Sequence, residues 1–297
     1  MSETTNFRDL LKNNKPLKIV GAINAYSAIL AKNAGHKCLY LSGSGVATAS
    51  YGIPDLGLTS LVDVKTDAQR ITNSCSLPLL VDIDTGWAES NDISFAIEEM
   101  VSAGVAAVHF EDQIDAKRCG HRPNKRLISI QEMNERIESA LLGKGSSEIF
   151  LIARTDALAS EGLDGCIERA IAYEGAGAEA LFLEAVTEIN QYIVLKEHIN
   201  IPILANITEF GKTPLFTEEQ LHSAGVDMML FPLSAFRAAS RASQKVYETI
   251  SKEGTQESLL DIMQTRDELY ESLDYLNFEK NLDTYLENKE NGNDKET

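Results

Sequence analysis

The sequence predicts a (β/α)₈ barrel, a TIM barrel of the α/β class, with a C-terminal helical extension. Three observations predict it: a repeated Ala-Gly signature before four apolar runs, four more apolar runs between these copies, and helical patterns in the gaps. The chain has 297 residues, of which 43% are hydrophobic, so it can bury one large core and has an ordinary length for such a barrel. We therefore expect residues 1–297 to form one domain.

The repeated signature is an Ala-Gly pair followed by three residues and an apolar run. The pairs are Ala34-Gly35, Ala103-Gly104, Ala176-Gly177 and Ala224-Gly225, and the runs are 39–41, 108–110, 181–183 and 229–231. Glycine is common where helices end, and short continuous apolar runs are typical of buried parallel strands. Each copy therefore predicts the end of a helix that leads into a barrel strand.

Four further apolar runs complete a set of eight expected strands, at 19–24, 79–84, 149–155 and 203–207. Helical patterns lie between them, for example at 93–103, 130–142 and 166–173, and Thr217-Glu218-Glu219-Gln220 has the form of a capping box. Eight alternations without a change in composition favour a closed barrel over a doubly wound sheet. We expect a helical extension over 234–288 and a flexible polar tail over 289–297.

Charge and composition restrict the partners. The formal net charge of −18 repels nucleic acid and anionic membranes, so neither is expected as a partner. A basic segment followed by an apolar run is missing at the N-terminus, and no apolar stretch approaches membrane-spanning length, so we expect a cytoplasmic protein. Cys38, Cys75 and Cys166 are expected to be structural thiols. An anionic substrate would require positive charge or a metal ion at the site.

Polar residues gather where the expected strands end, and in a barrel these positions face the active site. They are Tyr40, Ser42, Asp82, Asp84, His109, Glu111, Arg154, Asp156, Glu184, Asn206 and Thr208. Carboxylates at the ends of several strands, together with an arginine and an asparagine, predict a catalytic site at this end of the barrel.

Asp82 and Asp84 are two residues apart on one expected strand, so their side chains should point to the same face. Carboxylates without accompanying histidine or thiolate pairs suit Mg²⁺, with Mn²⁺ as an alternative. The sequence therefore predicts a divalent metal held by Asp82 and Asp84. Two interpretations of His109 stay open, a residue that orients the metal ligands or a hydrogen-bonded core residue.

The loop Lys117-Arg118-Cys119-Gly120-His121 follows the fourth expected strand. Basic neighbours favour the thiolate, so Cys119 can exchange a proton near neutral pH, as a general acid and base must. Cys119 could instead be a covalent nucleophile, but a metal among carboxylates favours enolate chemistry over acyl transfer. We therefore expect Cys119 to protonate the carbanion left by cleavage of a carbon–carbon bond.

Arginines supply the expected positive charge. Arg154 ends the fifth strand, Arg237 begins the helix after the eighth, and Arg266 lies in the helical extension. A guanidinium group binds a carboxylate with two parallel hydrogen bonds, so several of them suit a polycarboxylate. Because a helix arginine is exposed by default, the residues alone leave Arg266 open between a surface residue and a substrate ligand.

The chain resembles the isocitrate lyase and phosphoenolpyruvate mutase superfamily from about residue 21 to residue 286. The segments that carry the resemblance are Lys117-Arg118-Cys119-Gly120-His121-Arg122-Pro123-Asn124-Lys125, Ala153-Arg154-Thr155-Asp156, Leu204-Ala205-Asn206-Ile207-Thr208-Glu209-Phe210-Gly211 and Pro232-Leu233-Ser234-Ala235-Phe236-Arg237. The resemblance implies cleavage of the tricarboxylate 2-methylisocitrate to pyruvate and succinate in propionate catabolism. It also implies homotetramers that exchange C-terminal helices between subunits.

The resemblance also implies the site residues. Mg²⁺ would be held by Asp82 and Asp84, with water-mediated help from Glu111. The base that removes the hydroxyl proton stays open among Tyr40, Asp55 and Glu111. Substrate contacts would fall on Ser42, Gly43, Ser44, Cys119, Gly120, Arg154, Glu184, Asn206, Ile207, Thr208, Arg237 and Arg266. The loop 117–125 should close over the substrate, with Gly120 as its pivot.

Three positions depart from the family pattern: Ser44 and Ala88 stand where glycine is usual, and Leu183 where proline is usual. Leu183 lies beside Phe182, which with Leu230 is expected near the substrate methyl group. Isocitrate lyase or a related 2-hydroxy-polycarboxylate lyase is the nearest alternative, and some cleavage of isocitrate is expected. The phosphonate-forming relatives lack the cysteine loop. A non-catalytic acidic scaffold is the alternative from another class.

Overall fold

The structure, a computed structural model, describes residues 6–87 and 92–290, and the chain divides into two compact units, Met1–Arg237 and Ala238–Thr297. The first unit contains a closed barrel of eight parallel strands paired in chain order. The strands are β1 (Leu17–Gly21), β2 (Leu39–Leu41), β3 (Leu79–Asp82), β4 (Ala107–Glu111), β5 (Phe150–Thr155), β6 (Ala180–Leu183), β7 (Ile203–Asn206) and β8 (Met228–Phe231). β8 closes the barrel by pairing with β1, which confirms the predicted fold.

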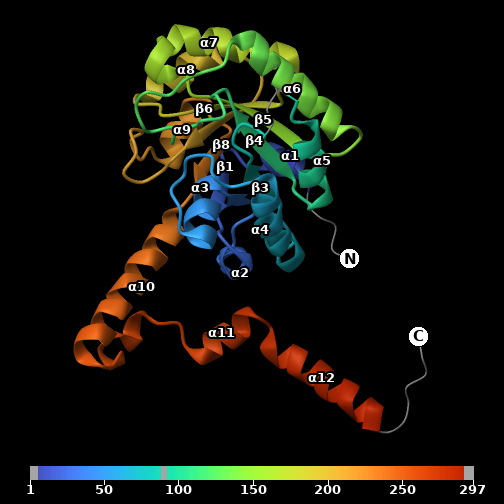
Figure 1. The fold of residues 1–297 in the computed structure, drawn as a ribbon, viewed down its shortest axis with the longest axis vertical. Helices are drawn as coiled ribbons and strands as arrows, with labels where there is room; N and C mark the ends of the chain where they lie inside the picture. The colour runs from blue at the N-terminus through green and yellow to red at the C-terminus, as the bar shows by residue number, and fades with distance from the viewer. Residues whose placement is uncertain (1–5, 88–91, 291–297) are drawn as a thin grey trace. The chain divides into compact units, whose positions relative to one another are not determined.

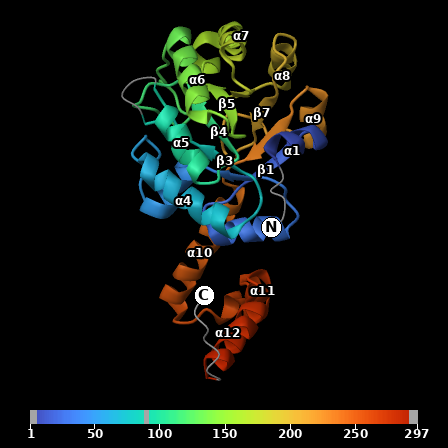
Figure 2. The ribbon, with the colours of Figure 1, turned by 90° about the vertical axis from the view of Figure 1, so that its right-hand side faces the viewer.

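Helices surround the strands of the first unit, as Figures 1 and 2 show. They are α1 (Phe7–Asn13), α2 (Ala25–Asn33), the short α3 (Gly43–Gly45) with a π-helical turn (Val46–Ser50), α4 (Leu61–Ser74), α5 (Ser94–Ser102), α6 (Ile130–Lys144), α7 (Leu158–Ala176), α8 (Ile189–Lys196) and α9 (Glu218–Ser223). The predicted capping box at the start of α9 is present, because Thr217 accepts a hydrogen bond from the backbone N–H of Gln220.

The Ala-Gly signature ends helices as predicted. The glycines of the four pairs have φ angles of 88°, 74°, 103° and 79°, in the left-handed region where glycine meets no steric penalty: Gly35, Gly104, Gly177 and Gly225. Each is followed by a strand. The repeat therefore sets the point at which the chain leaves the helical layer and enters the barrel.

Two layers of apolar side chains hold the barrel together. One fills the space between strands and helices, and the other fills the barrel interior with residues such as Ile19, Leu80 and Ile152. The helix α1 adds Phe7 and Leu10 to the interior cluster, and the ring of Phe7 lies 5.2 Å from that of Phe150. α1 thus closes the N-terminal end of the barrel.

Two strands end two or more residues earlier than expected. β1 ends at Gly21 rather than at residue 24, because Asn24 caps α2 by accepting a hydrogen bond from the backbone N–H of Ser27. β3 ends at Asp82 rather than at residue 84, and Asp84 lies in the following turn with a φ of 50°.

The second unit is helical, as predicted for the region after Ser234. It contains most of α10 (Ser234–Glu253), a 3₁₀ turn (Glu257–Ile262), α11 (Arg266–Ser272) and α12 (Tyr275–Glu290). The predicted tail falls largely on residues 291–297, which lie outside the described residues. That the helices extend a single barrel domain stays a prediction.

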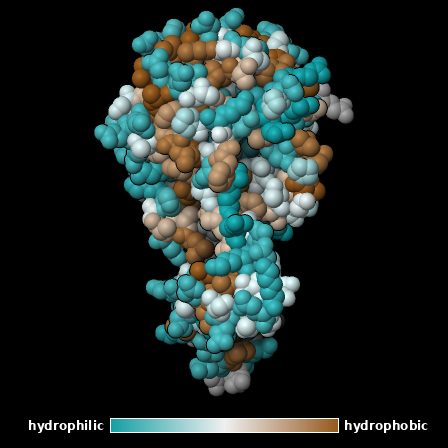
Figure 3. Space-filling view, turned by 90° about the vertical axis from the view of Figure 1, so that its left-hand side faces the viewer, coloured by the Kyte–Doolittle hydropathy of each residue, from teal (hydrophilic) through white to brown (hydrophobic). Residues whose placement is uncertain are grey.

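Many apolar side chains of the second unit face outward. Figure 3 shows hydrophobic surface among the hydrophilic surface of both units, and the exposed residues after α10 begins include Tyr247, Ile250, Leu276, Phe278 and Leu282. Across residues 6–87 and 92–290, none of the helices combines the length and the apolar character that crossing a membrane would need.

Candidate active site

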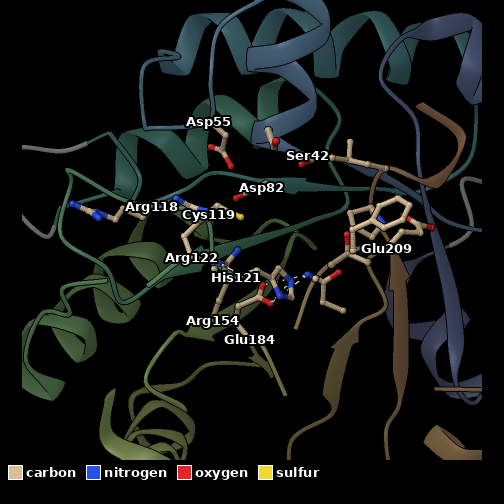
Figure 4. A pocket seen from close by; sticks show the side chains of 18 of the residues that line it. Ser42, Asp55, Asp82, Arg118, Cys119, His121, Arg122, Arg154, Glu184 and Glu209 are labelled. Atoms are coloured by element: carbon tan, nitrogen blue, oxygen red, sulfur yellow. Dashed lines mark hydrogen bonds and ion pairs between the residues drawn. The ribbon is translucent and has the colours of Figure 1, made fainter. Parts of the chain in front are cut away.

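A cavity of about 350 Å³ opens at the C-terminal ends of the strands. Twelve of the predicted site residues line it: Tyr40, Ser42, Ser44, Asp55, Asp82, Cys119, Gly120, Arg154, Glu184, Asn206, Thr208 and Arg237. Figure 4 shows the Cys119 thiol between Asp55 and Asp82 on one side and Arg154 and Glu184 on the other. The structure therefore brings together most of the residues that the sequence places at strand ends.

The predicted metal ligands converge on Gly43. A Cβ atom added at Gly43 would lie 3.1 Å from Oδ1 of Asp84 and 3.2 Å from Oδ2 of Asp82, so any side chain there would crowd both carboxylates. They do not meet by strand alternation, as the sequence suggested. They meet because the chain turns after Asp82, with the backbone N–H of Asp84 donating to Oδ1 of Asp82 at 3.1 Å.

The carboxyl groups of Asp82 and Asp84 are both buried, but their pKa values are shifted in opposite directions. Burial, reinforced by the negative charge of Asp82, raises the pKa of Asp84 to about 7 against the opposing effect of Lys117. Burial also opposes ionisation of Asp82, but His109, Lys117 and Arg154 together hold its pKa below the ordinary value. Two neighbouring buried carboxylates of this kind form an oxygen-rich, electron-rich position that suits a hard cation.

The protein groups fit Mg²⁺ as a partial ligand set. In the described part of the chain, no group of three histidine, cysteine, aspartate or glutamate side chains is arranged to hold a metal. Mg²⁺ usually binds one or two carboxylates and keeps waters or substrate oxygens in its remaining positions, so Asp82 and Asp84 are a sufficient protein contribution. Glu111, the expected helper, instead directs Oε2 at Arg154, 3.2 Å away.

Lys117 has a role that the sequence did not indicate. Its side chain is 5% exposed, and its Nζ atom lies 2.6 Å from Oδ1 of Asp55 and 2.5 Å from Oδ1 of Asp84. Burial opposes its charge, but the surrounding carboxylates raise the pKa of Lys117 above its usual value. The ammonium therefore ties the Cys119 loop to the acidic pair. The sequence suggested instead that it stabilises the thiolate.

Tyr40 and His109 form a buried pair beneath the cavity. The hydroxyl of Tyr40 lies 2.9 Å from Nε2 of His109, and their rings stack at 5.6 Å. Burial is the main cause that lowers the pKa of His109 to about 4, so the ring is neutral at pH 7 and its Nε2 can accept the Tyr40 proton. His109 is therefore the hydrogen-bonded core residue of the two interpretations, and it also approaches Asp82 at 3.7 Å.

Arg154 is surrounded by carboxylates. Its guanidinium donates to both oxygens of Asp156, at 3.0 and 3.2 Å, and also faces Glu111 at 3.2 Å and Glu184 at 3.5 Å. The same group lies 5.1 Å from the ring of Phe182, which lines the cavity. The positive charge expected from Arg154 is thus largely balanced within the protein.

Glu184 joins the Cys119 loop to β7. Its Oε1 atom lies 3.1 Å from Nε2 of His121, and Nδ2 of Asn206 donates to both of its oxygens, at 3.3 and 3.4 Å. Burial opposes ionisation, but Arg154 and then His121 lower the pKa of Glu184 to about 2. His121 also accepts a hydrogen bond at Nδ1 from the backbone N–H of Lys212 at 3.0 Å, so the imidazole links the Cys119 loop to the segment after β7.

The remaining predicted residues lie outside the cavity lining. Gly43, Asp84 and Glu111 stand directly behind it through the contacts above, and Ile207 is buried. Leu230 belongs to the interior core rather than to the expected methyl site. Arg266 begins α11 in the second unit, so its role stays a prediction, and Ala88 lies outside the described residues.

Comparison with known proteins shows the family to which the chain belongs. The family model for phosphoenolpyruvate phosphomutase matches residues 7–251. The 2-methylisocitrate lyase of Escherichia coli (strain K12) is 55% identical over 93% of this chain and 94% of its own, and that of Vibrio cholerae is 53% identical over 95% and 94%.

Solved structures agree in fold. A 2,3-dimethylmalate lyase has a TM-score of 0.87 at 30% identity and covers 96% of both chains. An oxaloacetate acetylhydrolase in complex with 3,3-difluorooxalacetate has a TM-score of 0.84 at 31% identity and covers 97% of both chains. The chain therefore belongs to the phosphoenolpyruvate phosphomutase family, among relatives that are 2-methylisocitrate lyases.

Proposed function

We propose that this protein is a magnesium-dependent 2-methylisocitrate lyase, which cleaves its substrate to pyruvate and succinate in the 2-methylcitrate cycle of propionate catabolism. The observation that carries the proposal is the position of Cys119 in a cavity lined by Asp82 from β3 and Arg154 from β5, with the thiol between these two side chains in Figure 4. The lyase relatives, at more than half identity over almost the whole chain, support the same substrate.

A divalent ion held by Asp82 and Asp84 would bind oxygen atoms of the substrate and stabilise negative charge that develops on them. Mg²⁺ suits this oxygen-only pair, and Mn²⁺ has similar preferences. The contact between Lys117 and Asp84 matters here, because the ammonium balances the acidic pair in the protein itself.

In the proposed reaction a base on the protein removes the hydroxyl proton of the substrate. The bond between the hydroxyl-bearing carbon and its neighbour then breaks, so the oxygen becomes the ketone of pyruvate and the electron pair stays on the succinate fragment. Cys119 delivers a proton to that carbon, which balances the proton taken at the start. The charged groups around the cavity, Arg154 and Arg237 among them, stabilise the negative charge that develops.

Asp55 is the proposed base. It lines the cavity, whereas Glu111 lies behind Arg154 and is not part of the lining. Tyr40 also lines the cavity, but its hydroxyl contacts Nε2 of His109 at 2.9 Å and donates to Oδ2 of Asp82 at 3.4 Å, so both partners can take its proton. Oδ1 of Asp55 pairs with Lys117 at 2.6 Å, so the other oxygen of this carboxylate is the proposed proton acceptor.

The substrate carboxylates are proposed to bind along the rest of the lining. Arg237 is 44% exposed and has one carboxylate nearby, Glu209 at 3.7 Å, so its guanidinium is more available than that of Arg154. Ser42, Ser44, Asn206 and Thr208 offer hydroxyl and amide groups from the other side. Phe182 provides an apolar wall for the substrate methyl group.

We also propose that the enzyme is a homotetramer that exchanges C-terminal helices. An apolar cleft of about 510 Å³ lies on the barrel between α2 and β8, lined by residues that include Val20, Leu30 and Phe231. The helix α10 has no buried residue among those described, and large exposed apolar surface is typical of subunit interfaces. Four free cysteines agree with a cytoplasmic location.

The decisive experiment measures pyruvate release from 2-methylisocitrate and glyoxylate release from isocitrate, side by side, with MgCl₂ or with EDTA. We expect pyruvate release to require the metal and to exceed glyoxylate release by about 10–200-fold, the discrimination that one methyl group provides. Faster release of glyoxylate would overturn the substrate assignment. Activity that survives EDTA would overturn the metal assignment.

A further inference from the structure

We propose that Gln113 and Lys125 are positioning residues, which clamp the backbone on both sides of Cys119 and so fix the place from which its thiol acts. The proposal deepens the proposed function, because it assumes that Cys119 donates the proton. Neither residue touches the substrate cavity. Each acts through the loop that carries Cys119.

Gln113 holds the residue before Cys119. Its Oε1 accepts a hydrogen bond from the backbone N–H of Arg118 at 2.9 Å, and its Nε2 donates to the carbonyl of Arg118 at 2.8 Å. The side chain is buried, and an isolated antiparallel bridge pairs Gln113 with Leu127. The Gln113 amide thus makes the same pair of hydrogen bonds with the Arg118 backbone that a neighbouring β-strand would make. These two bonds leave the Arg118 backbone little freedom to rotate.

Lys125 holds the residue after Cys119. Its Nζ atom donates to the carbonyl of Gly120 at 2.6 Å and lies 2.8 Å from Oδ1 of Asp156. The side chains of Lys125 and Asp156 are 4% and 0% exposed. A lysine drawn this far out of water toward one carbonyl is poorly explained by stability alone, because buried ion pairs contribute little net stabilisation.

The anchor of this second clamp is itself rigid. The backbone N–H of Asp156 donates to Oδ1 of Asp112 at 2.9 Å. The other oxygen of Asp112 accepts from Thr155 at 2.7 Å and from Tyr173 in α7 at 2.8 Å. Asp156 also binds Arg154 with both oxygens, so one carboxylate relates the loop to the arginine across the cavity.

Between the clamps, the backbone N–H of Arg122 donates to the carbonyl of Cys119 at 2.8 Å and closes a tight turn. The thiol is therefore carried on a short segment with both ends fixed. A displacement of about 1 Å in a catalytic group can lower a rate about a hundredfold, so fixing this segment has direct value for proton delivery.

The chain offers a matched control. Lys196 makes the same pair of contacts as Lys125: each lysine donates to a carbonyl five residues away and pairs with an aspartate 31 residues away. The partners of Lys196 are Ile201 and Asp227, which precede β7 and β8 at the opposite end of the barrel. Lys196→Met removes the same pair of contacts without touching the loop, at a position where the lysine side chain is 30% exposed.

The test compares Lys125→Met and Gln113→Met with Lys196→Met in the full-length protein. The first readout is the rate at which iodoacetamide alkylates Cys119 without substrate, followed by mass spectrometry of the peptide. The second is kcat and KM for 2-methylisocitrate. Releasing either clamp should raise the alkylation rate about tenfold and lower kcat about 10–100-fold, with little change in KM. Lys196→Met should leave all three values as in the wild type.

Wild-type alkylation rates in both clamp variants would overturn the proposal, whatever happens to kcat. An equal change in Lys196→Met would also overturn it, because the effect would then be general destabilisation. The two substitutions lie on opposite sides of Cys119, so either one that folds suffices for the comparison. If the wild type does not cleave 2-methylisocitrate, the proposed function fails, but the alkylation rates still decide the clamp.

Discussion

Nζ of Lys117 lies 2.5 Å from Oδ1 of Asp84, which places one buried ammonium against the proposed metal ligand. Removing it leaves Asp84 and Asp82 without a nearby lysine charge. We expect Lys117→Met to lower the free energy of unfolding by about 3–5 kcal/mol in EDTA, the usual effect of breaking a buried ion pair. MgCl₂ should restore part of this loss.

Urea unfolding with EDTA and with MgCl₂ measures both effects. Lys144→Met is the control, because Lys144 pairs with Glu179 at 2.7 Å away from the cavity. Its smaller loss should not depend on the metal. If MgCl₂ stabilises the Lys117→Met variant no more than the wild type, Asp82 and Asp84 do not form the metal site.

Replacing Cys119 by serine should abolish turnover while substrate still binds. A hydroxyl is a far weaker acid than a thiol, and loss of a general acid lowers a rate by about 10²–10⁴-fold. Pyruvate release measures turnover, and calorimetric titration measures binding. Cys75→Ser, at a buried thiol outside the cavity, is the control. Near-normal turnover in Cys119→Ser would remove Cys119 from the chemistry.

The candidate bases can be separated by two substitutions. Asp55→Asn should lower kcat by about 10²–10⁴-fold, because the amide cannot accept the hydroxyl proton. Tyr40→Phe should lower kcat by about tenfold or less, the effect of losing the hydrogen bonds of its hydroxyl with His109 and Asp82. Steady-state assays of pyruvate release distinguish them. The reverse order would make Tyr40 the base.

Gly120 allows the loop to approach the opposite wall of the cavity. A Cβ atom there would lie 2.4 Å from Cγ of Glu184 and 2.5 Å from a guanidinium nitrogen of Arg154. Gly120→Ala should therefore hold the loop away and lower kcat about a hundredfold.

Gly175→Ala is the matched control for that change, since a Cβ atom at this position in α7 meets nothing within 4 Å. It should leave kcat unchanged and raise stability by about 0.5–1 kcal/mol, because alanine favours a helix. Thermal unfolding and pyruvate assays compare the two variants. Wild-type kcat in Gly120→Ala would show that the close approach is unnecessary.

Thiol labelling should find one reactive cysteine. Burial is the main cause that raises the pKa of Cys166 to about 12, and burial also raises the pKa of Cys38. The thiolate is the reactive form, and pH 8 lies far below these raised pKa values, so both thiols stay almost entirely protonated. Mass spectrometry after brief alkylation at pH 8 should show modification at Cys119, the one cysteine of the four that is not buried. Equal labelling of Cys166 would contradict this.

The barrel was predictable because its signals are local. Eight residues are enough to encode both the glycine with positive φ that ends a helix and the apolar strand that follows it. Ala103-Gly104 and the run 108–110 are an example. The strand-end residues followed from the topology, since adjacent strands place Glu111 beside Arg154 and Asp82 beside His109.

The pairing of charges within the site was not predictable in the same way. Lys117 lies two positions before Cys119 in sequence, yet its long side chain reaches Asp84, which is 33 positions earlier. Asp156 looked like a strand-end carboxylate, and only its contacts with Arg154 and Lys125 give it a role. Such pairs depend on tertiary distances that neither periodicity nor spacing contains.

Because α1 closes the N-terminal end of the barrel, it restricts the route by which products can leave the cavity. Because Phe7 and Leu10 fill the N-terminal end of the barrel, the cavity has no exit in that direction. Cleavage turns one molecule into two, and both products must then leave through the mouth of the cavity at the C-terminal ends of the strands. The product nearer the mouth of the cavity must leave before the deeper one, so the fold itself imposes an order on product release.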